Sequence, residues 1–118
     1  MVSKVYFTKD PNQADKLFDA AGFDKIIRKD DAVALKIHFG EPGNTAYLKS
    51  ERVKPVAEKI KNGGANPFYT DCNVLYHSPR DNSRQHRAVA EKHGYTNVII
   101  PEESDCLSIA VNLKHFKK

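Results

Sequence analysis

The sequence contains no tryptophan, one methionine and only two cysteines, Cys72 and Cys106. Two cysteines so far apart exclude a disulfide scaffold, a zinc site of four cysteines and a self-contained iron–sulfur cluster. No apolar run approaches the roughly 20 residues that a transmembrane helix needs. The apolar stretch before Asp10 is also too short for a signal peptide. We therefore expect a cytoplasmic protein without a membrane partner.

Charge and hydropathy are those of a globular domain. The length of 118 residues predicts a single domain over residues 1–118, and 40% hydrophobic with 29% charged residues is a globular composition. The net charge of +4 suits an anionic partner. No basic stripe with interleaved aromatic residues accompanies that charge, so a nucleic-acid partner is not expected.

Apolar periodicity alternates between strand and helix along the whole chain. The expected helices begin near Asn12, Ser50 and Asn82 and end at glycines. The expected strands are Lys4–Thr8, Ala32–Phe39, Asn66–Asp71, Val98–Pro101 and, less regularly, Leu107–Leu113. This order predicts an open three-layer β-α-β sandwich, with a mostly parallel sheet of four to five strands and about three helices.

Two strands carry more specific expectations. The first half of Ala32–Phe39 is continuously apolar, which is typical of a central strand covered on both faces. Leu107–Leu113 follows a short connection and is expected to run antiparallel or to lie at an edge of the sheet. An exposed edge pairs readily with a second copy, so a homodimer formed through this edge is one prediction.

The loop after the second strand is the first candidate site. Its ligand-binding candidates are glycines, which allow close backbone approach, and short polar side chains. It has neither the Walker A pattern nor the Gly-x-Gly-x-x-Gly fingerprint, so it predicts an anion site or a simple tight turn. The candidates are Gly40, Glu41, Gly43, Asn44 and Thr45.

The loop after the third strand is the second candidate site, and parallel strands bring such loops to one edge of a sheet. Arg80 can clamp a small anion through two parallel hydrogen bonds, with Asn73 beside it. His38, Asp71 and His86 are the candidates for acid–base chemistry or for a divalent metal. None of them has a strong metal-ligand spacing, and His86 also fits simple packing on a helix face.

Three blocks of this sequence, taken in order, resemble the family called domain of unknown function 362. The blocks are Ala34–Thr45, then Thr70–Tyr76 with Arg80–Asn82 and His86, and finally Asn112–Lys118. Members of that family are associated with iron–sulfur centres and are often longer, with a cysteine-rich cluster module downstream. That module is absent here, and Cys72 stands where related sequences more often carry threonine. The resemblance therefore implies the N-terminal α/β part of the family, without an iron–sulfur cluster held by this chain.

Three functions follow from these patterns. The first is the binding of a small anionic ligand or a metal ion at the two loops. The second is an enzyme for a small metabolite, with His38 or His86 as acid–base group oriented by Asp71 or Glu41. The third is an interaction module that pairs through the exposed sheet edge. The sequence names no substrate for any of them.

Overall fold

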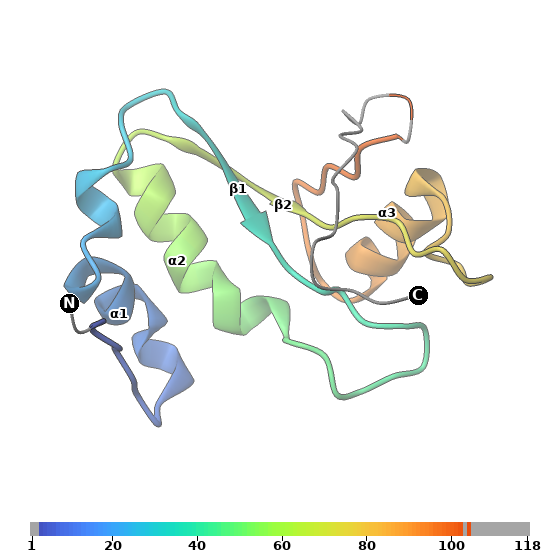
Figure 1. Cartoon of the computed structure of the whole chain (residues 1–118), viewed down its shortest axis with the longest axis horizontal. Coiled ribbons are helices and arrows are strands. Elements are labelled where there is room, and N and C mark those ends of the chain that lie inside the picture. Colours follow the sequence, from blue (N-terminus) through green and yellow to red (C-terminus); the bar gives the residue numbers. More distant parts are fainter. Residues whose placement is uncertain (1–2, 103, 105–118) are drawn as a thin grey trace, which may run out of the picture.

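The computed structural model describes residues 3–102 and 104 (Figure 1). Helices α1 and α2 pack together at one end, and α3 lies beyond the carboxyl ends of the two strands. In chain order the elements are η1 (Pro11–Gln13), α1 (Ala14–Ala20), η2 (Phe23–Lys25), β1 (Ala32–Lys36), α2 (Ser50–Asn62), β2 (Asn66–Thr70) and α3 (Ser83–Lys92).

The helices begin and end close to where the sequence predicts. Helix α3 starts at the expected cap, because the Asn82 side chain accepts a hydrogen bond from the Gln85 amide at 2.9 Å. The first helix differs in its cap. Asp10 caps the short helix η1, with its carboxylate 3.0 Å from the Asn12 amide and Pro11 at the first helical position. Helix α1 follows directly, with Gln13 as its N-cap and no side-chain cap.

Strands β1 and β2 pair in parallel, in register from Ala32 opposite Asn66 to Lys36 opposite Thr70. They are the only two strands longer than a single bridge in residues 3–102. The predicted strand Val98–Pro101 lies beside β2 on the side away from β1, but it contributes one bridge, between Tyr69 and Val98. Part of the reason is Pro101, which has no amide hydrogen to donate. The four to five strands that we expected are therefore not present among the described residues.

The predicted strand Lys4–Thr8 is wrong. Val5 and Phe7 are 88% and 78% exposed, and the segment pairs with no strand of the described residues. A strand is held by its pairing, and three apolar residues have too little surface to hold one beside the two-stranded sheet. The predicted strand Leu107–Leu113 lies outside the described residues.

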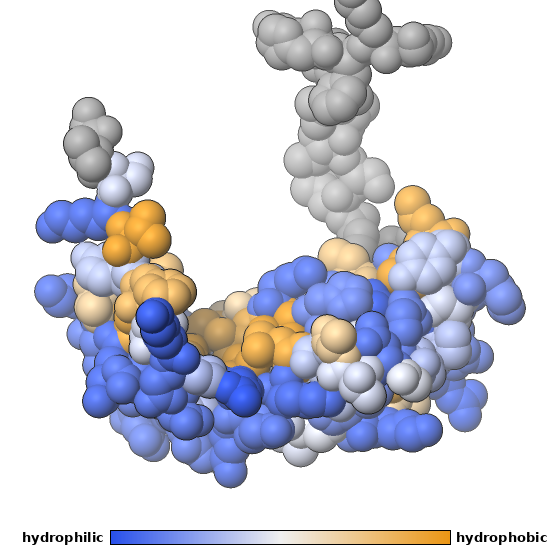
Figure 2. All heavy atoms as spheres, turned by 90° about the horizontal axis from the view of Figure 1, so that it is seen from below, coloured by the Kyte–Doolittle hydropathy of each residue, from blue (hydrophilic) through white to orange (hydrophobic). Residues whose placement is uncertain are grey.

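The expectation that β1 is covered on both faces is also wrong. Val33 and Leu35 are half-buried, whereas Ala32, Ala34 and Lys36 are exposed. The apolar run predicted full burial, but its exposed members are alanines, whose small side chains lose little by facing water. Figure 2 shows apolar side chains that remain on the surface, in the hollow between the two ends of the molecule.

The core is aromatic and lies at the carboxyl ends of the strands. Tyr95 is 1% exposed and meets the rings of Phe39 and Tyr69 edge-on, with centroids 4.9 and 5.0 Å apart. Val53, Ala90, Val98 and Ile100 complete this cluster. Burying Phe39 completely contributes about 1.5–3 kcal/mol and fixes the strand end from which the first candidate loop starts. The described helices include none that is long and apolar enough to cross a membrane.

Candidate functional site

The two candidate loops meet, as adjacent parallel strands require. Residues 38–45 follow β1 and residues 71–82 follow β2, so both loops leave the sheet at the same edge. Glu41 joins them through two hydrogen bonds. Glu41 accepts from the Tyr76 hydroxyl at 2.6 Å and from the Ser78 hydroxyl at 2.9 Å. The edge is therefore closed by side chains that are more than 30 residues apart in the sequence.

Arg80 is the centre of this cluster. Its side chain is 2% exposed. Its Nη1 atom lies 2.9 Å from Nε2 of His38 and 3.2 Å from a carboxylate oxygen of Glu41. Its Nε donates to Nε2 of His86 at 3.3 Å, and Nη2 lies 3.6 Å from Asp71. Four of the residues proposed from the sequence thus face one guanidinium, which is always charged.

The contacts of His86 define its protonation. Its Nε2 accepts from Arg80, so the ring proton lies on Nδ1, which donates to the Asn73 side-chain oxygen at 3.2 Å. The Asn73 amide then donates to Ser83 at 2.8 Å, and the Ser83 hydroxyl donates to the Pro101 carbonyl at 2.9 Å. Burial, and then the neighbouring Arg80 charge, lower the pKa of His86. The imidazole is therefore a neutral link in a directed chain of hydrogen bonds.

Asp71 is buried beside Arg80 and is incompletely satisfied. One carboxylate oxygen accepts from the Cys72 amide at 2.9 Å and pairs with the ammonium group of Lys36 at 3.2 Å. The other oxygen is buried and has no hydrogen-bond partner among the described residues. Arg80 approaches it only to ion-pair distance. An unsatisfied buried oxygen of this kind costs about 1–3 kcal/mol.

Both carboxylate oxygens of Glu41 have hydrogen-bond donors. Its bond to Tyr76 is the main cause of a lowered pKa, and Ser78, Arg80 and His38 lower it further. The same bond raises the pKa of the Tyr76 phenol. Glu41 is therefore an ionised carboxylate held by two hydroxyl groups and one guanidinium.

The rest of the first loop forms a turn outside the cluster. The Asn44 amide donates to the Glu41 carbonyl at 3.0 Å, and Gly43 has φ of +82°, as the third residue of a type II turn requires. The Asn44 side chain accepts from the Ala46 amide at 2.7 Å. Gly43, Asn44 and Thr45 are exposed, and no hydrogen bond from them to Arg80 is present. Their predicted ligand contacts stay predictions.

The geometry does not support the metal site predicted at His38, Asp71 and His86. Among residues 3–102 and 104, no group of three His, Cys, Asp or Glu side chains is placed to hold a metal ion. The physical reason is that the Arg80 guanidinium occupies the position on which the three side chains converge. A permanent cation there repels a metal ion rather than leaving room for one.

The sequence reasoning missed three contributors. Lys36 lies two residues before His38 on an exposed strand face, and only the fold shows that it reaches Asp71. Tyr76 and Ser78 were read as part of a polar loop. The signal for Ser78 was its position two residues before Arg80, because its hydroxyl accepts from the Arg80 amide at 3.0 Å and closes a local turn.

His93, the C-cap residue of α3, contacts residues on both sides of the turn in the first candidate loop. His93 Nδ1 lies 2.8 Å from the Phe39 carbonyl oxygen, and its ring stacks on Tyr47 at 4.1 Å between centroids. Gly40 is packed so closely against Tyr47 that an added Cβ would lie 2.7 Å from the tyrosine Cβ. His93 thus fixes the backbone that precedes Glu41.

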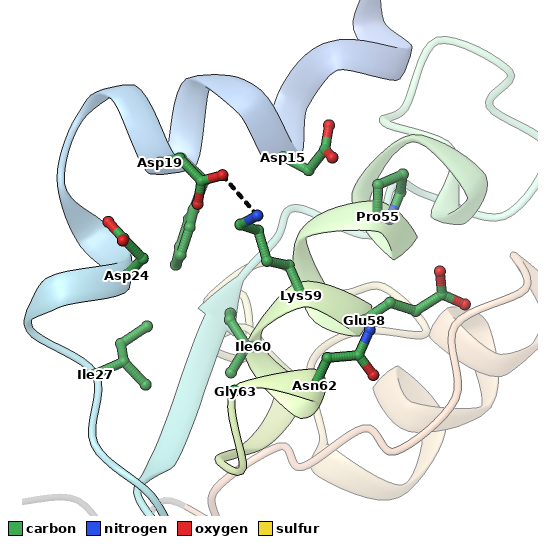
Figure 3. A pocket seen from close by; sticks show the side chains of 11 residues that line it. Asp15, Asp19, Asp24, Ile27, Pro55, Glu58, Lys59, Ile60, Asn62 and Gly63 are labelled. Atoms are coloured by element: carbon green, nitrogen blue, oxygen red, sulfur yellow. Dashed lines mark ion pairs between the residues drawn. The ribbon is translucent and has the colours of Figure 1, made fainter.

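A separate cavity of about 700 Å³ lies between α1, η2 and α2, away from this cluster (Figure 3). Its rim is acidic, with Asp15, Asp24 and Glu58, and the ammonium group of Lys59 pairs with Asp19 at 2.6 Å across it. The sequence reasoning assigned nothing to this place. Lys59 is an internal cation that already neutralises part of the acidic rim.

Comparisons with known proteins place the chain in a family. The family model of the domain of unknown function (DUF362) matches residues 33–116, which begin in β1 and include both loops of the Arg80 cluster. The search of curated proteins and the search of solved structures found no match. The match spans well over half of the 118 residues, and on this basis the chain belongs to the DUF362 family.

Proposed function

We propose that this domain binds a small anionic ligand where the loops after β1 and β2 meet, with Arg80 as the anchoring cation. The observation that carries the proposal is the burial of Arg80, at 2% exposure, with its guanidinium facing side chains from both loops. A buried arginine that is held from several sides recognises carboxylate or phosphate oxygens without the cost of ordering a flexible chain.

The surroundings of Arg80 favour an anion over a cation. Lys36 adds a second positive charge at the same edge, 64% exposed and therefore accessible from solvent. Tyr76 and Ser78 present hydroxyl donors on the rim. Donors and cations of this kind, facing the carboxyl edge of a parallel sheet, are a common form of anion site in α/β domains.

Acid–base catalysis, the alternative, has weaker support. His86 is completely buried, and both of its ring nitrogens already have partners in the protein. His38 is exposed, but its Nε2 lies 2.9 Å from Arg80 Nη1 and its Nδ1 accepts from the Gly40 amide at 3.2 Å. Neither imidazole presents a free nitrogen to a substrate, so the geometry favours binding over proton transfer.

The test is a titration of the whole chain with inorganic phosphate and, separately, with acetate, followed by amide and arginine Nε–H resonances. Chloride at equal ionic strength is the control ion. We expect saturable shifts for at least one of the two anions, concentrated in residues 38–45 and 71–82. Lys36→Ala should weaken binding, whereas Arg84→Ala, which removes an exposed arginine from α3, should not. Shifts that follow chloride equally would reject the proposal.

A further inference from the structure

We infer that the ligand is a carboxylate, and that the side chain of Glu41 occupies its position in the ligand-free domain. The inference rests on the proposed function, since it concerns the same site. It adds two things, which are the chemical class of the ligand and a built-in competitor.

The donors around Glu41 match the two oxygens of a carboxylate. Tyr76 donates to one carboxylate oxygen at 2.6 Å, and Ser78 donates to the other at 2.9 Å. Arg80 adds a charged nitrogen 3.2 Å from the oxygen that Tyr76 also contacts. Both oxygens of one planar group are therefore satisfied, and a protein site that already holds a carboxylate shows which group its donors fit.

Arg80 and Ser78 are held independently of Glu41, whereas Tyr76, at 57% exposure, is not. Arg80 is buried, and its main chain is tied to the loop, because its carbonyl accepts from the Val74 amide at 3.1 Å and its amide donates to Ser78 at 3.0 Å. Glu41 instead belongs to the other loop, and its side chain is 32% exposed. The residues after it form an exposed turn. Rotation of the Glu41 side chain into solvent would leave the donors of Arg80 and Ser78 in place.

Glu41 and its three donors lie on different loops. Glu41 comes from the loop after β1, whereas Tyr76, Ser78 and Arg80 all come from the loop after β2. A side chain tethered in this way competes with a free carboxylate at a high effective concentration. The apparent affinity for the free ligand is reduced by the fraction of molecules in which Glu41 fills the site. Glu41 thus sets the concentration at which the domain responds.

The experiment uses Glu41→Ala in the whole chain, with acetate as the probe. The substitution removes the atoms that acetate would replace, namely one methylene and the carboxylate, so acetate can refill the vacancy. Glu58→Ala is the matched control, since it removes an exposed carboxylate from α2. Acetamide is the matched probe, with the same shape but no charge. The readouts are the Arg80 Nε–H resonance and the shift of the thermal midpoint with probe concentration.

We expect Glu41→Ala to bind acetate at least about tenfold more tightly than the wild-type chain, with no gain for acetamide and none in Glu58→Ala. Glu41→Gln, which keeps the shape of the side chain, should give an intermediate gain and guards against a folding effect of the alanine. Equal acetate affinity in wild type and Glu41→Ala would overturn the competitor role but leave the proposed function standing. Binding of phosphate but not of acetate would overturn the carboxylate class alone. A chain that binds neither anion in any variant would reject both.

Discussion

Removing the charge of Arg80 tests the centre of the cluster most directly. In Arg80→Met the side chain keeps a similar length and loses every donor. His86, which is completely buried, then has an Nε2 acceptor without a partner. Asp71, 5% exposed, keeps Lys36 but loses the only other charged donor beside its orphaned oxygen. Removing one of the two cations that pair with a buried carboxylate lowers the free energy of unfolding by about 3–5 kcal/mol, much of which comes from the charge that is left unpaired.

The assay is urea denaturation followed by tyrosine fluorescence, with the slope compared between variants. A small domain has roughly 5–15 kcal/mol of stability in total, so Arg80→Met is expected to lose a large part of it. The double variant Arg80→Met with Asp71→Asn removes the stranded charge and should recover at least about 1 kcal/mol. Additive losses in the double variant, or a loss below about 1 kcal/mol in Arg80→Met, would refute the assignment of Arg80 as the counter-charge of Asp71. If Arg80→Met does not fold, the same cycle with Arg80→Gln, which also removes the charge but keeps amide donors, gives the coupling.

Three further predictions concern stability. Burial lowers the pKa of His86 in the folded state below the value of 6.5 that applies to the unfolded chain, so protons bind preferentially to the unfolded state. The stability of the domain should therefore be unaffected by His86 above pH 6.5 and should decrease as the pH falls below it. His86→Asn should flatten this decrease in a pH series of urea midpoints. Gly40→Ala should destabilise more than Gly43→Ala in the same assay, because both have positive φ but only the first meets Tyr47, and equal losses would contradict the packing argument. Asn82→Ala should cost about 0.5–2 kcal/mol by loss of the α3 cap, and a thermal midpoint unchanged from wild type would show that the cap is dispensable.

The helices were predictable because their signals are local. Asn82 three residues before Gln85, and the apolar stripe that starts at Val53, depend only on neighbours in the sequence. The strand Lys4–Thr8 was not predictable in the same way. Its apolar residues are those of a strand, but pairing depends on what lies beside it, and the sequence alone does not contain that information. The sequence of β1 did not indicate its alternating exposure, because alanine is tolerated on either face of a strand.

The candidate site was predictable as a place but not as a mechanism. The rule that loops gather at the carboxyl edge of a parallel sheet brought His38, Asp71, Arg80 and His86 to one cluster before any geometry was known. What the rule does not give is which side chain takes the centre. A metal ion and an arginine satisfy the same surrounding carboxylates and imidazoles, and only the distances to the Arg80 guanidinium distinguish the two.

The burial of Arg80 is itself an argument for a binding role. In the described residues the buried apolar side chains are few, and a network of buried charges next to them does not add stability over apolar residues of the same volume. The unsatisfied oxygen of Asp71 makes the cluster more costly still. A fold selected for stability would fill this position with leucine or methionine. A fold that must keep a rigid cation at the edge of its sheet, close to solvent and with hydroxyl donors beside it, requires an arginine held from several sides, which is the arrangement around Arg80.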